Sequence, residues 1–121
     1  MARSDGLPDL LVGGFLEGKF ELVTSEFQIG EFKRVSRYPR VKRFLKPERA
    51  GLLINALRES ALIVRVIDRF ESSAGEDDNA IISVALAGEA KILVSGDVQH
   101  VISVGRLKIV TVEEAVSLLR L

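Results

Sequence analysis

Residues 76–97 read EDDNAIISVALAGEAKILVSGD, and this stretch is the most informative about the fold. Its acidic start is followed by an apolar, alanine-rich run that ends near Gly88, which predicts a helix capped by Asp77 or Asp78. Residues 91–95 (KILVS) then predict a short strand that is apolar on both faces. Such strands are typical of a parallel sheet covered by helices on both sides. The stretch therefore favours an α/β fold.

The rest of the chain continues the alternation of helices and strands. Prolines suit the first turns of two helices, and two capping boxes mark the starts of two others. The expected helices run from Pro8 to about Gly18, from Ser25 to the interruption at Tyr38-Pro39, from Pro47 to Ala61, and onward from Thr111; the other expected strands are 19–24, 62–67 and 107–110. No repeat or long linker divides the chain, so residues 1–121 are expected to form one domain.

The composition excludes several classes of site. There is no cysteine, which rules out a disulfide scaffold, a thiolate nucleophile and cysteine-containing zinc sites. His100 is the single histidine, so multi-histidine metal sites are excluded as well. No apolar run approaches the roughly 18 residues of a membrane span, and the start of the chain lacks the apolar segment of a signal peptide. We expect a soluble cytoplasmic protein with no membrane partner.

The charges balance in total but are segregated along the chain. Lys and Arg together number 17, as do Asp and Glu. Between positions 33 and 49, eight basic residues face one acid, Glu48, whereas five acids between positions 68 and 78 face one base, Arg69. The basic run is interpreted either as a solvated helix face or as a surface for a phosphate backbone.

Three acids are expected at one edge of the sheet. Glu31 follows the strand 19–24, Asp78 begins the helix after the strand 62–67, and Asp97 follows the strand 91–95. In a parallel α/β sheet these positions share the edge at which ligands bind. Carboxylates without His or Cys suit Mg²⁺ or Mn²⁺, and such an ion can activate water. The alternatives are an N-cap role for Asp77 or Asp78, a solvated Glu31 and a turn at Asp97.

Three stretches carry a resemblance to the PIN-domain family, in particular its toxin components of toxin–antitoxin systems. The most specific is 76–97, with an Asp-Asp-Asn helix start, an alanine-rich helix, an apolar strand and a Ser-Gly-Asp ending. The others are EGKFELVTSEFQIGEFKRVSRYPRV (17–41) and KIVTVEEAV (108–116). The resemblance implies a PIN-like three-layer α/β fold with a mainly parallel sheet.

The resemblance also implies a function, that of a metal-dependent endoribonuclease using Mg²⁺ or Mn²⁺. Glu31 and Asp97 then match two metal ligands, Asp78 matches the third, and Asn79 assists it. Asp77 and Ser95 are expected to support the site. An antitoxin protein is an expected partner. RNA is the expected substrate, bound by the basic residues Arg34, Arg37, Arg40, Lys42 and Arg43.

The chain departs from the family pattern at two places. After Asp97 it reads Val98-Gln99-His100-Val101, where the family usually has another acid and two leucines. The family also begins with a central strand ending in Asp-Thr-Asn, whereas this chain starts with ARSDGLPDLL at positions 2–11. We therefore expect an N-terminally truncated sheet without its first central strand. Unpaired strand edges are costly, so the sheet re-closes or a second chain covers it, and a homo-oligomer is expected.

Two function classes remain open at this point. One is the metal-dependent endoribonuclease, weakened by the loss of the family's first Asp. The other is a non-catalytic module that binds nucleic acid or an antitoxin. A phosphate-accepting receiver domain is disfavoured, because it needs a Lys after the last strand and Lys108 lies within it.

Overall fold

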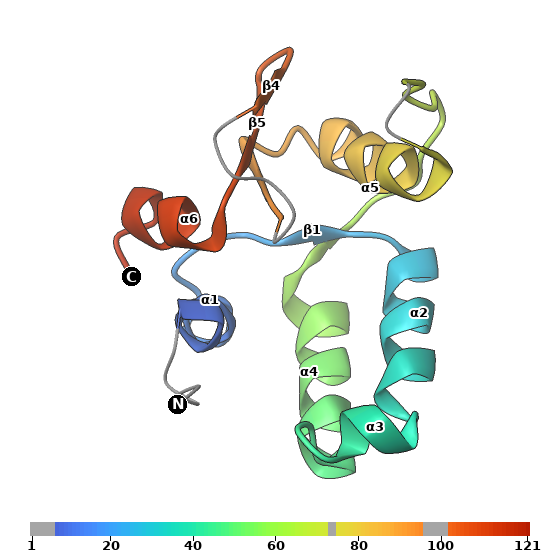
Figure 1. Ribbon diagram of the computed structural model, residues 1–121, viewed down its shortest axis with the longest axis vertical. Helices are drawn as coiled ribbons and strands as arrows, with labels where there is room; N and C mark the ends of the chain where they lie inside the picture. The colour runs from blue at the N-terminus through green and yellow to red at the C-terminus, as the bar shows by residue number, and fades with distance from the viewer. Residues whose placement is uncertain (1–6, 73–74, 96–101) are drawn as a thin grey trace.

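A computed structural model describes residues 7–72, 75–95 and 102–121, and it is mixed α/β (Figure 1). These ranges hold six helices and two small sheets. In chain order the elements are α1 (Leu7–Leu16), β1 (Val23–Thr24), α2 (Glu26–Ser36), α3 (Pro39–Lys42), α4 (Pro47–Ser60), β2 (Leu62–Ile63), α5 (Glu76–Ala87), β3 (Ile92–Val94), β4 (Ile102–Val104), β5 (Leu107–Val110) and α6 (Val112–Leu118). Among the described residues, no helix is both long enough and apolar enough to cross a membrane.

The described strands form two sheets that share no backbone ladder. β1 pairs with β2 in parallel, and the second sheet has the order β3-β5-β4. The expected parallel pairing is confirmed for β1 with β2 and for β3 with β5. β4 was not expected; it pairs antiparallel to β5 through a two-residue turn in which Gly105 has φ +60°. A positive φ at that position suits a tight hairpin turn.

Helix α5 connects the two sheets by side-chain packing. It contacts β1 of one sheet and β3 of the other. Its apolar side chains Ile82 and Ala85 form the main buried cluster with Leu107 and Ile109 of β5. Elsewhere α2 lies beside α4, and α1 lies against α6 (Figure 1). Packing against one shared helix therefore holds together sheets that are not hydrogen-bonded to each other.

The strand expected at 19–24 is shorter than predicted. Only Val23 and Thr24 pair with β2. The preceding residues close α1 instead: Gly18, at φ +75°, donates to Phe15 O, and Lys19 donates to Gly14 O at 2.9 Å. This pattern satisfies the last carbonyls of the helix. The backbone of residues 18 and 19 is thus occupied by the helix end and cannot extend the strand.

The strand expected at 62–67 is also too long. β2 covers Leu62–Ile63, and Val64 adds one more bond from its N–H to Thr24 O at 2.9 Å. Ser25 then begins α2, so the partner strand ends and offers no further backbone groups. Ile67 is 88 % exposed.

The helix boundaries were predicted more accurately than the strand lengths. Ser25 caps α2 by accepting from Gln28 N–H at 3.2 Å, and Thr111 caps α6 by accepting from Glu114 N–H at 3.0 Å. The caps predicted at Asp77 or Asp78 are wrong, because α5 begins at Glu76 with Gly75 as its N-cap. The φ of +112° at Gly75 and a bond from Asn79 N–H to Gly75 O start the helix earlier.

We predict that Gly88→Ala destabilises the fold and that Gly51→Ala does not. A Cβ at position 88, at the end of α5, would lie 2.3 Å from Val23 Cγ1 on β1. Such overpacking costs about 1–3 kcal/mol. Position 51, inside α4, has nothing within 4 Å of an added Cβ, so alanine there should raise the free energy of unfolding by up to about 1 kcal/mol. Chemical denaturation of both variants measures this.

The double variant Val23→Ala/Gly88→Ala tests the cause. Removing the Val23 methyl groups should make room for the new Cβ, so the double variant should lose less stability than the two single changes added together. Strict additivity of the two losses would contradict the close packing of α5 on β1.

Candidate nucleic-acid interface

All eight basic residues of the run between positions 33 and 49 are exposed. They lie at the end of α2, along α3 and its turn, and at the start of α4, which form the end of the helical pair far from the sheets (Figure 1). This basic cluster consists of Lys33, Arg34, Arg37, Arg40, Lys42, Arg43, Lys46 and Arg49. The five residues predicted to bind RNA all belong to it.

The basic cluster is almost uncompensated. Within the described part of the chain, Arg34 is its one member that forms an ion pair. Glu48 is the one acid inside the segment, and it is exposed. Like charges on neighbouring turns repel, and their summed field attracts a polyanion over several ångströms. Exposed cations that have no protein partner are free to replace the counterions of a phosphate backbone.

Glu31 lies two residues before the basic cluster and forms an ion pair with one of its members, Arg34. Its two carboxylate oxygens accept from Arg34 Nη2 at 2.7 Å and from Arg34 Nε at 3.1 Å. The same guanidinium lies 5.5 Å from the centroid of the Tyr38 ring and donates from Nη1 to the Tyr38 hydroxyl. Tyr38 was not among the predicted site residues, although its spacing of four residues from Arg34 is one at which side chains on a helix meet.

The ion pair favours the charged form of Glu31. The hydrogen bonds from Arg34 hold the pKa of the Glu31 carboxyl below its ordinary value, and the pKa of Arg34 is raised by the same bonds. Because the pKa of Glu31 is lowered on folding, the pair contributes above the ordinary glutamate pKa. That contribution is lost as the pH falls through the lowered value. Both side chains are about half exposed, so the pair adds little to stability at neutral pH.

Two adjacent residues in the first turn of α5, Asp78 and Asn79, differ in their exposure and in their hydrogen bonds. Asp78 is exposed and makes no hydrogen bond or ion pair with the described residues. Asn79 is 4 % exposed: its Oδ1 accepts from Ser72 Oγ at 2.6 Å and its Nδ2 donates to Ser72 O at 3.1 Å. Ser83 continues the connection, donating to Asn79 O and accepting from Phe70 N–H. Asn79 thus holds the incoming loop on α5, and its role toward a metal stays a prediction.

The structure describes two of the three predicted acids, Glu31 and Asp78. Figure 1 shows α5 antiparallel to β1, so the first turn of α5 lies on the side where β1 leads into α2. Glu31 is in α2 and Asp78 is in that first turn. Asp97 and His100 lie outside the described residues, as does the side chain of Asp77. In the part of the chain that is described, no three acidic or histidine side chains gather closely enough to hold a metal ion.

Ser95 is the remaining predicted site residue, and it directly follows β3. Its N–H donates to Val110 O at 2.9 Å, so it extends the ladder between β3 and β5 by one bond. β3 itself spans Ile92–Val94, one residue shorter at each end than the expected strand 91–95, and the flanking hydrogen bond at its start is Lys108 N–H to Lys91 O at 3.0 Å. Ser95 is half-buried at the end of the strand next to the predicted acidic edge.

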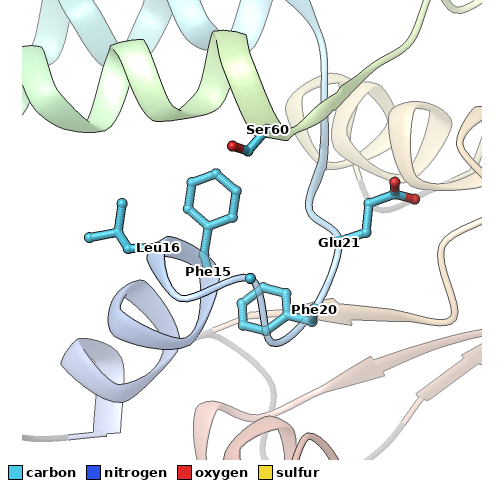
Figure 2. A pocket seen from close by; sticks show the side chains of 6 residues that line it. Phe15, Leu16, Phe20, Glu21 and Ser60 are labelled. Carbon is cyan, nitrogen blue, oxygen red and sulfur yellow. The ribbon is translucent and has the colours of Figure 1, made fainter.

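A hollow of about 310 Å³ lies elsewhere, between the end of α1 and the end of α4. Figure 2 shows the Phe15 ring directed toward Ser60, with Phe20 below it and Glu21 at one side. The two rings are tilted, with centroids 6.5 Å apart. No basic residue and no predicted site residue lines the hollow, so it is separate from the candidate interface.

We predict that Asn79→Ala destabilises the protein and that Asp78→Ala does not. Removing the buried amide deletes both hydrogen bonds between Asn79 and Ser72, each worth about 0.5–1.5 kcal/mol. Asp78, its exposed neighbour, should change the free energy of unfolding by less than about 0.5 kcal/mol. Equal losses in thermal or chemical denaturation would contradict the assignment of Asn79 as the anchor of the loop.

The candidate site thus consists of a basic cluster on a helical pair and an acidic turn at the start of α5. Arg34, a member of the basic cluster, and its ion-pair partner Glu31 lie on α2, between the rest of the cluster and this turn. These features come from the chain's own residues. No family model, no curated protein and no solved structure matches this chain.

Proposed function

We propose that this chain is a metal-dependent endoribonuclease that holds RNA on the basic cluster and cuts it at the acidic edge. The basic cluster is the observation that supports the proposal most. Of its eight exposed cations, Arg34 is the one that forms an ion pair within the described residues. Such a cluster binds a phosphate backbone without sequence preference. The resemblance of residues 76–97 to PIN domains supports the cleavage step. RNA as substrate fits the expected cytoplasmic location.

The predicted ligands are carboxylates, which are the kind of ligand that a hard divalent cation prefers. Asp78 offers a free, exposed carboxylate, and Mg²⁺ and Mn²⁺ prefer oxygen ligands. Glu31 must exchange its bonds with Arg34 before it can hold a cation, and Asp97 is proposed as the third ligand. When bound, the ion lowers the pKa of a water and stabilises charge on the phosphate. Arg34, once released, can bind an RNA phosphate.

A non-catalytic RNA-binding module is the second candidate function. The Glu31–Arg34 ion pair favours it, because both carboxylate oxygens of Glu31 are already occupied by a guanidinium. In that case the basic cluster binds RNA, and the acidic edge has no role in bond cleavage. The two candidates share the binding surface and differ in whether bound RNA is cut.

Cleavage of RNA in the presence of Mn²⁺ should depend on Asp78 and Asp97. We expect the wild-type chain to cut a single-stranded RNA, and chelation by EDTA to abolish the cut. Asp78→Asn and Asp97→Asn should each slow it by at least about 10–100-fold, the loss typical even of residues that only orient a metal ligand. Glu113→Gln removes an exposed acid of α6 and should leave the rate unchanged.

Binding measured in parallel separates the two candidates. RNA that binds with strong salt dependence but is never cut identifies the non-catalytic module. A cut that persists in Asp97→Asn at the wild-type rate reveals a contaminating nuclease and contradicts the proposal.

A second copy of the chain is proposed as a partner, besides an antitoxin protein suggested by the resemblance. Within the described residues, β1 is hydrogen-bonded only to β2 and β3 only to β5, so each has one open edge. Open strand edges pair readily with another chain. We predict a dimer or larger species, with a mass of at least twice 13.3 kDa in sedimentation equilibrium. A mass of 13.3 kDa at every concentration would contradict self-association.

A further inference from the structure

One aromatic side chain projects from the turn between α3 and α4. Phe44 is 85 % exposed and lies between Arg43 and Lys46, which are exposed as well. Single exposed apolar residues are common on protein surfaces and need no explanation alone. Phe44, however, is surrounded along the chain by the basic cluster, and its neighbour Leu45 is partly buried. The ring is therefore presented among cations while the adjacent apolar side chain anchors the turn.

A second exposed aromatic ring belongs to the same segment. Tyr38 is 40 % exposed at the junction of α2 and α3. Arg34 lies over its ring and donates to its hydroxyl, so the ring is held in one orientation. Between positions 33 and 49, Tyr38 and Phe44 are the two exposed aromatic residues among the exposed basic ones.

We infer that the basic cluster binds single-stranded RNA, with the ring of Phe44 stacking on an unpaired base and the lysines and arginines binding the phosphates. The inference rests on the proposed function for the nature of the ligand, RNA, and adds which side chain recognises its unpaired bases. Basic grooves that carry aromatic side chains bind single strands in this way, because every base has a π face.

The aromatic component distinguishes a single strand from a duplex. Cations alone bind the phosphates of either form, since the backbone charge is present in both. A ring can stack on a base only where that base is not already stacked between its neighbours, as in loops and single strands. An acidic peptide would pair with the cations but would gain nothing specific from an exposed phenyl ring. Charge and ring together thus favour the single strand.

The test is the binding of the full-length chain to a fluorescein-labelled eight-nucleotide RNA, followed by fluorescence anisotropy in EDTA so that no cleavage occurs. Phe44→Ala should weaken binding by about 5- to 100-fold, the loss of one stacked base. Leu118→Ala is the control for loss of an exposed apolar side chain, because Leu118 is 56 % exposed on α6, outside the basic cluster and the predicted acidic edge. It should bind like the wild type, and so should Phe44→Trp, which keeps an aromatic ring.

A spectroscopic readout confirms the contact independently of affinity. The chain has no tryptophan, so the emission of Phe44→Trp comes from position 44 and should be quenched when RNA binds. Duplex RNA should bind Phe44→Ala and the wild type equally. Circular dichroism of each variant shows whether it is folded; if Phe44→Ala is not, retained affinity and quenching in Phe44→Trp decide the matter.

Wild-type affinity in a folded Phe44→Ala, or an unquenched Phe44→Trp, overturns the stacking inference and leaves RNA cleavage as a separate question. Tighter binding of an eight-residue poly-glutamate peptide than of the RNA overturns it in favour of a protein partner. RNA binding that depends on Phe44, in a chain that never cuts RNA with Mn²⁺, upholds the inference while the nuclease proposal fails. Absence of any RNA binding at low salt removes both.

Discussion

The packing of α5 holds the two sheets together. Just after its end Gly88 fits against Val23 of β1, and nearer its start Asn79 and Ser83 hold the backbone of Ser72 and Phe70. Between these ends, Ile82 and Ala85 cover β5. Because the two sheets share no ladder, this helix supplies the connection that backbone hydrogen bonds supply in a continuous sheet. The acidic turn is fixed in place by the same contacts.

The sequence predicted the helices well because their signals are local. Ser25 and Thr111 act as caps through bonds to residues three positions away, and Pro47 begins α4 as expected. The strands 19–24 and 62–67 were predicted too long, because a strand ends where its partner ends, whereas β5 has the predicted bounds 107–110. Residues 65–67 do not continue the strand, because β1 ends at Thr24 and Ser25 caps α2. The continuity of a sheet depends on contacts between segments far apart in the chain, which periodicity does not reveal.

The candidate site divides in the same way. The basic cluster could be predicted from composition alone, since eight cations in seventeen residues cannot all be buried. The partner of Glu31 could not be predicted, because a carboxylate can bind either a metal ion or an arginine. The contrast between Asp78 and Asn79 was also hidden: adjacent residues on a helix point about 100° apart, and the fold decides which is buried. Charge patterns were therefore more informative than individual ligand assignments.

The contact between α1 and α6 has a consequence for synthesis on the ribosome. Leu121 packs against Gly14, and the two helices meet across almost the whole chain. At roughly 5–20 residues per second, about 5–20 s pass between translation of the first helix and of its partner. During that time the apolar side chains of α1 lack the surface that will cover them. The nascent chain therefore exposes this helix to chaperones until α6 has been translated.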